Sequence, residues 1–176
     1  MGGGLGLGPV AATVRALAAA SVPVTPVVIA GKNKKLVRRF AGEARRDGAG
    51  VRVLGFVENV FDWMHAADVL ITKPGGLTTS EALAARVPMV LLRPLPGQEE
   101  RNARYLVSRG AALRARNGPD LVRVVDRVLH DPATAERVRD AASALAHPDA
   151  AEIVATRIAQ LARQAPEPAV ALSSLR

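Results

Sequence analysis

The sequence contains no cysteine. This absence excludes disulfide scaffolds, zinc-thiolate and iron–sulfur sites and thiol nucleophiles, and it leaves the cytoplasm as the expected compartment. Aromatic residues make up only 3% of the chain, so side chains on which nucleic-acid bases stack are scarce. The chain has no uncharged apolar run of about 18 residues, and it begins with glycines instead of a basic segment followed by an apolar one. We therefore expect neither a membrane-spanning helix nor a signal peptide.

The residues that are abundant suit one compact domain. The chain has 176 residues, of which 49% are hydrophobic and 23% charged, with 33 Ala and 20 Arg against 4 Lys. This composition favours a core of small and branched aliphatic side chains arranged in helices over an all-β sandwich. We expect one domain over residues 1–165 and a flexible tail over residues 166–176, where the apolar periodicity stops.

The positive charge is concentrated near the amino terminus. Residues 1–57 carry nine Lys or Arg and two acids, a balance of +7, whereas residues 58–176 carry fifteen and fourteen, a balance of +1. Such a basic patch suits a nucleic acid, an anionic membrane surface or a phosphate-bearing ligand. A solvated helix face would give the same charge, so the charge by itself does not select among these partners.

Apolar runs and helical periodicities alternate along the chain. Strands are predicted at residues 23–30, 51–55, 67–72, 88–92 and 110–113, and helices at 9–20, 34–46, 60–66, 78–85 and 99–108, with three more after Gly118. Alternation of this kind predicts an α/β fold, a Rossmann-like parallel sheet with helices on both faces. The glycine-rich residues 2–8 are typical of a loop that follows a strand, so we expect the first, central strand to be truncated.

One polar motif follows the third predicted strand. Residues 73–81 read KPGGLTTSE; the two glycines permit close backbone approach, and three hydroxyls add donors at a helix N-terminus. These groups suit a diphosphate held without metal, and the chain has no D-x-D pair for a divalent cation. The alternative is a structural capping box, because Thr78 and Glu81 have the S/T-x-x-E spacing.

A second polar motif follows the next strand. Residues 97–103 read GQEERNA, and ligands of parallel sheets bind at the carboxyl ends of the strands, so both motifs are expected on one rim. Amide and carboxylate side chains suit the hydroxyls of a sugar. The alternative is an ordinary helix start, where acidic residues are favoured. The three histidines share no spacing with carboxylates that indicates a metal site or a catalytic triad.

Together the segments resemble the C-terminal donor half of GT-B glycosyltransferases. The matching stretches are the glycine-rich start, VIAGKNKKL at 28–36, GFV at 55–57, ADVLITKPGG at 67–76 and PGQEERNA at 96–103. Within that class the sequence is most similar to the diacylglycerol glucosyltransferases and galactolipid synthases, and more distantly to the peptidoglycan GlcNAc transferase, whose C-terminal domain defines glycosyltransferase family 28. The resemblance covers roughly residues 2–112, in order and at family-like spacing.

The resemblance implies a role for each motif. It assigns the uracil edge to the backbone at Phe56 and Val57, the ribose to Glu81, the diphosphate to Gly75, Gly76, Thr78, Thr79 and Ser80, and the sugar to Gln98, Glu99 and Asn102. Lys73 would lie near the nucleotide, and Gly4 would face the cleft between the two halves. Family members are longer, because an N-terminal domain supplies the acceptor groove and the general base. No catalytic residue and no metal ligand are therefore assigned in this chain.

The implied function is inverting transfer of a sugar from a UDP-sugar to a lipid acceptor, with this chain as the donor-binding half. The implied partners are an N-terminal acceptor domain and, through the basic patch, an anionic membrane, which would make the protein peripheral on the inner face of the membrane. No cofactor is expected besides the donor substrate. The alternative is an inactive nucleotide-sugar-binding module that acts with a partner chain, and a nucleic-acid binder is the third candidate.

Overall fold

The computed structural model describes residues 10–43 and 50–164. The chain divides into two compact units, Met1–Ala146 and His147–Arg176. In the second unit, the described residues include the helix α8 (Ala150–Gln164). The predicted tail at 166–176 lies outside the described residues, so the boundary at 165 stays a prediction.

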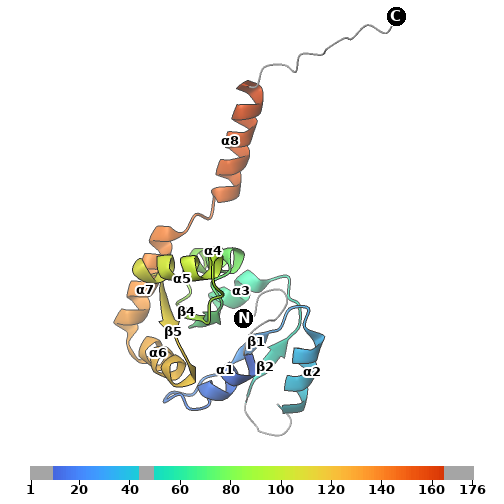
Figure 1. The fold of residues 1–176 in the computed structure, drawn as a ribbon, viewed down its shortest axis with the longest axis vertical. Coiled ribbons are helices and arrows are strands. Elements are labelled where there is room, and N and C mark those ends of the chain that lie inside the picture. The colour runs from blue at the N-terminus through green and yellow to red at the C-terminus, as the bar shows by residue number, and fades with distance from the viewer. Residues whose placement is uncertain (1–9, 44–49, 165–176) are drawn as a thin grey trace, which may run out of the picture. The chain divides into compact units, whose positions relative to one another are not determined.

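The first unit alternates strands with helices (Figure 1). Its elements are α1 (Val10–Leu17), β1 (Val27–Ile29), α2 (Lys34–Glu43), β2 (Arg52–Leu54), α3 (Val60–His65), β3 (Leu70–Thr72), α4 (Gly76–Ala84), β4 (Met89–Leu92), α5 (Gln98–Ser108), β5 (Ala112–Ala115), α6 (Gly118–His130) and α7 (Pro132–Leu145). Each predicted strand and helix therefore has a counterpart. In the described part of the chain, no helix has both the length and the apolar character that crossing a membrane would require.

Among the described residues, the strand pairs are all parallel and form two sheets. β1 pairs with β2, with Val28 opposite Val53. The other sheet has the order β3-β4-β5, with β4 in the centre. These parallel strands with intervening helices confirm the predicted Rossmann-like α/β fold class. Within residues 10–43 and 50–164, no strand joins β1 to β3.

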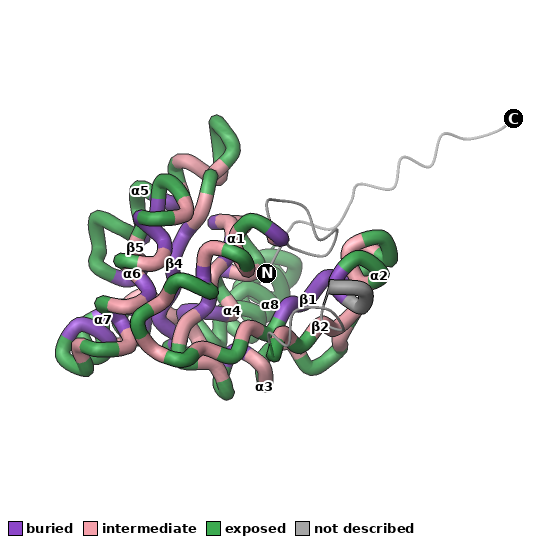
Figure 2. The backbone as a smooth tube through the Cα atoms, turned by 90° about the horizontal axis from the view of Figure 1, so that it is seen from below, coloured by how far each residue is buried: buried purple, intermediate pink, exposed green. Residues whose placement is uncertain are grey.

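The central strand β4 is buried on both faces. Met89 and Leu91 pack into a cluster with α3, α4, α5 and α7, whereas Val90 packs into another cluster with α1 and α6. Successive side chains of a strand point to opposite faces, so the two clusters are the two layers that cover this sheet. Buried residues run along β4 and along most of β1, as the purple segments show in Figure 2.

The sheet of β1 and β2 has a smaller core of its own. Val28 and Phe40 are buried there together with Ala11 of α1, and Val51 and Val53 pack against them. On α2, which carries Phe40, the side chains of the basic residues Lys35 and Arg38 are exposed, while Arg45 and Arg46 lie outside the described residues.

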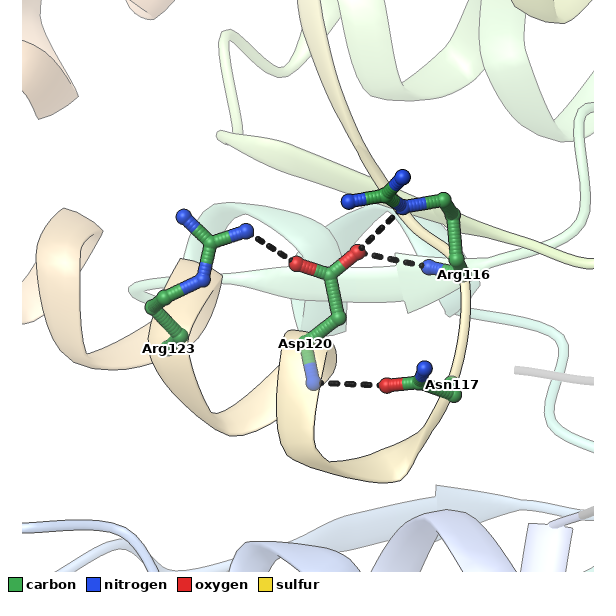
Figure 3. Close-up of polar contacts among 4 residues, drawn as sticks. All are labelled: Arg116, Asn117, Asp120 and Arg123. Carbon is green, nitrogen blue, oxygen red and sulfur yellow. Dashed lines mark hydrogen bonds and ion pairs between the residues drawn. The ribbon is translucent and has the colours of Figure 1, made fainter.

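The carboxylate of Asp120 stabilises the turn between β5 and α6 (Figure 3). Asp120 is only 9% exposed and accepts hydrogen bonds from the backbone N–H of Arg116, at 3.0 Å, and from the guanidinium groups of Arg116 and Arg123. Asn117 caps the helix by accepting a hydrogen bond from the backbone N–H of Asp120. The hydrogen bonds to its carboxylate lower the pKa of Asp120, and the bond from the backbone N–H of Arg116 makes the largest contribution.

We predict that Asp120→Asn destabilises the protein in a pH-dependent manner. A carboxyl whose pKa is lowered by folding stabilises the folded state above its unfolded pKa, and it loses that contribution as the pH falls through the folded pKa. Urea unfolding should therefore show a less stable variant at about pH 7, with the difference from wild type shrinking below about pH 4. Asp68→Asn, at an exposed carboxylate, is the control. A difference that is the same at both pH values would contradict the prediction.

Candidate donor-binding site

The first predicted motif forms the loop between β3 and α4. Its backbone turns sharply, because the N–H of Gly75 donates to the carbonyl of Lys73 at 2.9 Å. Gly75 is the N-cap residue, and α4 begins at Gly76, two residues before the predicted start. No side chain caps this helix. The capping-box interpretation of Thr78 and Glu81 is therefore wrong, because Thr78 lies inside the first turn.

The start of α4 presents backbone donors. Its first intrahelical bond runs from the N–H of Thr79 to the carbonyl of Gly75, at 3.0 Å. The N–H groups of Gly76, Leu77 and Thr78 precede that bond, so the helix offers them no acceptor. Together with the helix dipole, three such donors favour a bound anion.

The two glycines of this loop have no role that the fold requires. Gly75 has φ −72° and ψ 141°, a conformation that any residue adopts. A Cβ atom added at Gly75 or Gly76 would meet nothing within 4 Å. Gly97 is different, because its φ of +94° strains any other residue. The missing side chains at 75 and 76 therefore leave the backbone donors open to a ligand.

The three hydroxyls of the motif differ in their surroundings. Thr79 is 6% exposed, and its hydroxyl donates to the carbonyls of Gly75 and Gly76 at 2.9 and 3.0 Å. The side chain of Thr79 therefore stiffens the loop. Ser80 is exposed and Thr78 is partly buried. Glu81 is also partly buried, near the middle of α4.

The second motif is attached to the first. Glu99 of α5 accepts a hydrogen bond from the backbone N–H of Leu95 at 2.8 Å, and it pairs with the ammonium of Lys73 at 3.4 Å. Asn102 donates its side-chain N–H to the carbonyl of Pro74 at 3.0 Å. The structure thus brings Lys73, Glu99 and Asn102 together. Gln98, in the first turn of α5, is exposed.

An ion pair holds α5 against the edge strand β5. Arg114 makes two hydrogen bonds to the carboxylate of Glu100, at 2.8 and 3.0 Å. The Arg114 bond is the largest of several influences that together lower the pKa of Glu100. Sequence reasoning missed this pair, because the two residues lie on different elements and their spacing of fourteen residues has no periodicity.

The predicted base-binding residues follow β2, at the end of the other sheet. Phe56 is 63% exposed, and the ammonium of Lys32 lies 6.0 Å from the centre of its ring. Val57 is partly buried. Lys32, which follows β1, lies in one of the stretches that carry the resemblance, but the sequence analysis gave it no role. Gly4 lies outside the described residues.

The charged groups of this rim do not form a metal-binding cluster. Across the described ranges, no three His, Asp or Glu side chains gather closely enough to hold an ion. The rim offers backbone N–H donors, hydroxyls, one lysine and two amides. These groups suit an anionic, hydroxyl-rich ligand.

Comparison with known proteins assigns the chain to a family. The family model described as "Glycosyl transferases group 1" matches residues 10–144. The chain belongs to this family. The match includes α4 and α5, so both polar loops lie inside the region that the chain shares with the family.

Several curated relatives share one name. The chain is 35% identical over 142 residues to the processive diacylglycerol beta-glucosyltransferases of Bacillus cereus (strain AH187) and Bacillus anthracis (strain A0248), which covers 80% of this chain. The chain spans 37% of the length of those relatives.

Solved structures share the fold of this chain. MurG of Acinetobacter baumannii aligns with a TM-score of 0.69 and 24% identity, over 90% of this chain and 48% of MurG. Anabaena Alr3699/HepE, solved in complex with UDP-glucose, aligns with a TM-score of 0.67 and 19% identity, over 88% of this chain and 45% of HepE. The predicted resemblance to the GT-B fold is thereby confirmed, while the role as the donor half stays a prediction.

Proposed function

We propose that this chain binds a UDP-sugar and is the donor half of a glycosyltransferase with a lipid acceptor. The observation that carries the proposal is the start of α4, where three backbone N–H groups lie open behind two glycines that the fold does not need. A diphosphate matches these donors in charge and in number of acceptors. The names of the Bacillus relatives support a glucosyl donor and a diacylglycerol-type acceptor.

The proposed chemistry is a single displacement. The acceptor oxygen forms a bond to the anomeric carbon while the bond from that carbon to the diphosphate oxygen breaks, and UDP leaves with the electron pair. The start of α4 and Lys73 stabilise the charge that develops on UDP, without a metal. The proton of the acceptor hydroxyl passes to a base that this chain does not supply.

Positioning is the second task of this rim. Asn102 fixes the carbonyl of Pro74, and Glu99 fixes both Lys73 and the loop at Leu95. These bonds hold the diphosphate loop against α5, so Gln98 and the free oxygen of Asn102 are left to contact the sugar. In this proposal the main role of Glu99 is to position the loop and Lys73. Exposed Lys35 and Arg38 on α2 would favour an anionic membrane, where a lipid acceptor resides.

We predict that Glu81→Ala weakens UDP binding about tenfold, because a hydrogen bond to a charged group contributes about 1.5 kcal/mol. Its stability should change by no more than about 0.5 kcal/mol, since Glu81 caps no helix end. Isothermal calorimetry with UDP and urea unfolding measure the two effects separately.

The matched control is Glu152→Ala, an exposed acid on α8, which should leave both values unchanged. If the Glu81 variant loses stability but keeps its UDP affinity, the role of this residue is structural. In a transfer assay, the chain is combined with an acceptor domain. If the chain binds UDP but no sugar is transferred, the result would favour the alternative of an inactive binding module.

A further inference from the structure

The outer face of α5 is strongly basic. Arg101 and Arg104 lie in this helix, Arg109 is its C-cap residue, and all three side chains are exposed. With about 3.6 residues per turn, these positions lie on the side of the helix that faces away from the buried residues Ala103 and Leu106. The helix therefore presents three guanidinium groups to the solvent on one side.

The acidic residues of α5 do not neutralise this face. Glu99 pairs with Lys73, and Glu100 accepts two hydrogen bonds from Arg114. The bond from Arg114 is the largest influence on the pKa of Glu100, and Arg104 makes the smallest of the contributions that lower it. Within the described ranges, none of the three arginines of the face forms an ion pair with an acid. Their charge is available to a partner outside the chain.

A tyrosine lies among these arginines. Tyr105 is 51% exposed, and the guanidinium carbon of Arg109 lies 5.5 Å from the centre of its ring. Tyrosine combines an apolar ring with a polar hydroxyl, so it suits the boundary between water and a lipid layer. The face thus offers cations for phosphate headgroups and a ring for the layer beneath them.

We propose that the outer face of α5 lies against an anionic membrane surface. A membrane is flat, so it contacts the cations from Arg101 to Arg109 together, along about 12 Å of helix. A nucleic acid also attracts arginines, but α5 has only one aromatic ring on which a base could stack. The choice of a lipid surface rests on the lipid acceptor of the proposed function.

The basic face begins beside the proposed donor site. Gln98, which would contact the sugar, lies seven positions before Tyr105, and a spacing of about two turns places both residues on the same side of α5. A membrane held against Tyr105 is then about 10 Å along the helix from Gln98. The headgroup of an acceptor lipid therefore has a short path to the donor.

The test uses the 176-residue chain, which has no cysteine of its own. The variant Ser108→Cys, at an exposed position near the end of α5, carries the environment-sensitive dye NBD, and Ser143→Cys, exposed on α7, is the matched control. With vesicles of phosphatidylglycerol and phosphatidylcholine, the fluorescence should rise at least about twofold for the dye at 108 and stay unchanged at 143. Vesicles of phosphatidylcholine alone should leave both signals unchanged.

Charge variants separate α5 from α2. The combined substitutions Arg101→Gln, Arg104→Gln and Arg109→Gln should weaken co-sedimentation with the anionic vesicles at least about tenfold, because each cation near such a surface adds to the attraction. Lys35→Gln combined with Arg38→Gln, at exposed positions of α2, should weaken it less. Added salt should weaken the binding of the wild type.

Three results would overturn the proposal: no binding to anionic vesicles, full binding by the triple α5 variant, or an equal dye response at 108 and 143. Binding of an oligonucleotide that the triple variant loses, without any vesicle binding, would assign the face to nucleic acid instead. UDP titrations of the same samples report separately on the donor site. Loss of vesicle binding with the UDP affinity intact contradicts only the membrane-facing surface and leaves the proposed function standing.

Discussion

Gly76→Val is expected to lower the affinity for UDP at least about tenfold, which corresponds to about 1.4 kcal/mol. The new side chain would project from the first residue of α4, where the backbone donors of Leu77 and Thr78 are open. The protein itself has room for it, because a Cβ atom at Gly76 meets nothing within 4 Å. Since valine is no worse than glycine in a helix, the free energy of unfolding should not fall.

Gly50→Val is the matched control for this substitution. Gly50 is also exposed and also open to a Cβ atom, but it precedes β2, at the opposite end of the strands from the loop. The control should keep its full UDP affinity in the same calorimetric titration. If Gly76→Val binds UDP as tightly as the control, the glycine pair serves no ligand and the proposed diphosphate site is wrong.

Leu91→Ala is expected to lower the free energy of unfolding by about 2 to 5 kcal/mol. Leu91 is fully buried in β4 and belongs to the cluster that joins this strand to α4 and α5. Removing its side chain leaves a cavity beneath the elements that carry both polar loops. Urea denaturation followed by circular dichroism measures the loss.

Leu77→Ala is the control for the loss of leucine atoms. Leu77 is 84% exposed on α4, so its removal should change the free energy of unfolding by no more than about 0.5 kcal/mol. Equal effects of the two substitutions would mean that β4 is not the centre of the core.

The order of strands and helices follows from the sequence because burial imposes a pattern on it. Met89, Val90 and Leu91 form an unbroken apolar run, as a strand covered on both faces requires. The start of α4 is harder to predict. Thr78 has the preferred chemistry of an N-cap, yet the turn closed by Gly75 begins the helix earlier, and local propensity yields to that turn.

The sequence predicts that both polar motifs lie on one rim of the sheet, while the arrangement of their side chains is not predictable from it. Both loops follow neighbouring parallel strands, β3 and β4, so a common rim was expected. The hydrogen bond from Asn102 to the carbonyl of Pro74 joins residues 28 positions apart, and no periodicity of the sequence predicts it. The buried hydroxyl of Thr79 and the contact between Lys32 and Phe56 are likewise products of tertiary packing.

The most direct test of the account is a calorimetric titration of the 176-residue chain with UDP in the presence of EDTA. The helix start and its hydroxyls offer donors for a diphosphate, whereas no cluster of metal ligands forms within residues 10–43 and 50–164. We predict saturable one-to-one binding with an affinity that does not change when magnesium or manganese replaces the chelator. Binding that occurs only with a divalent cation, or no binding under either condition, would contradict the proposed metal-independent donor site.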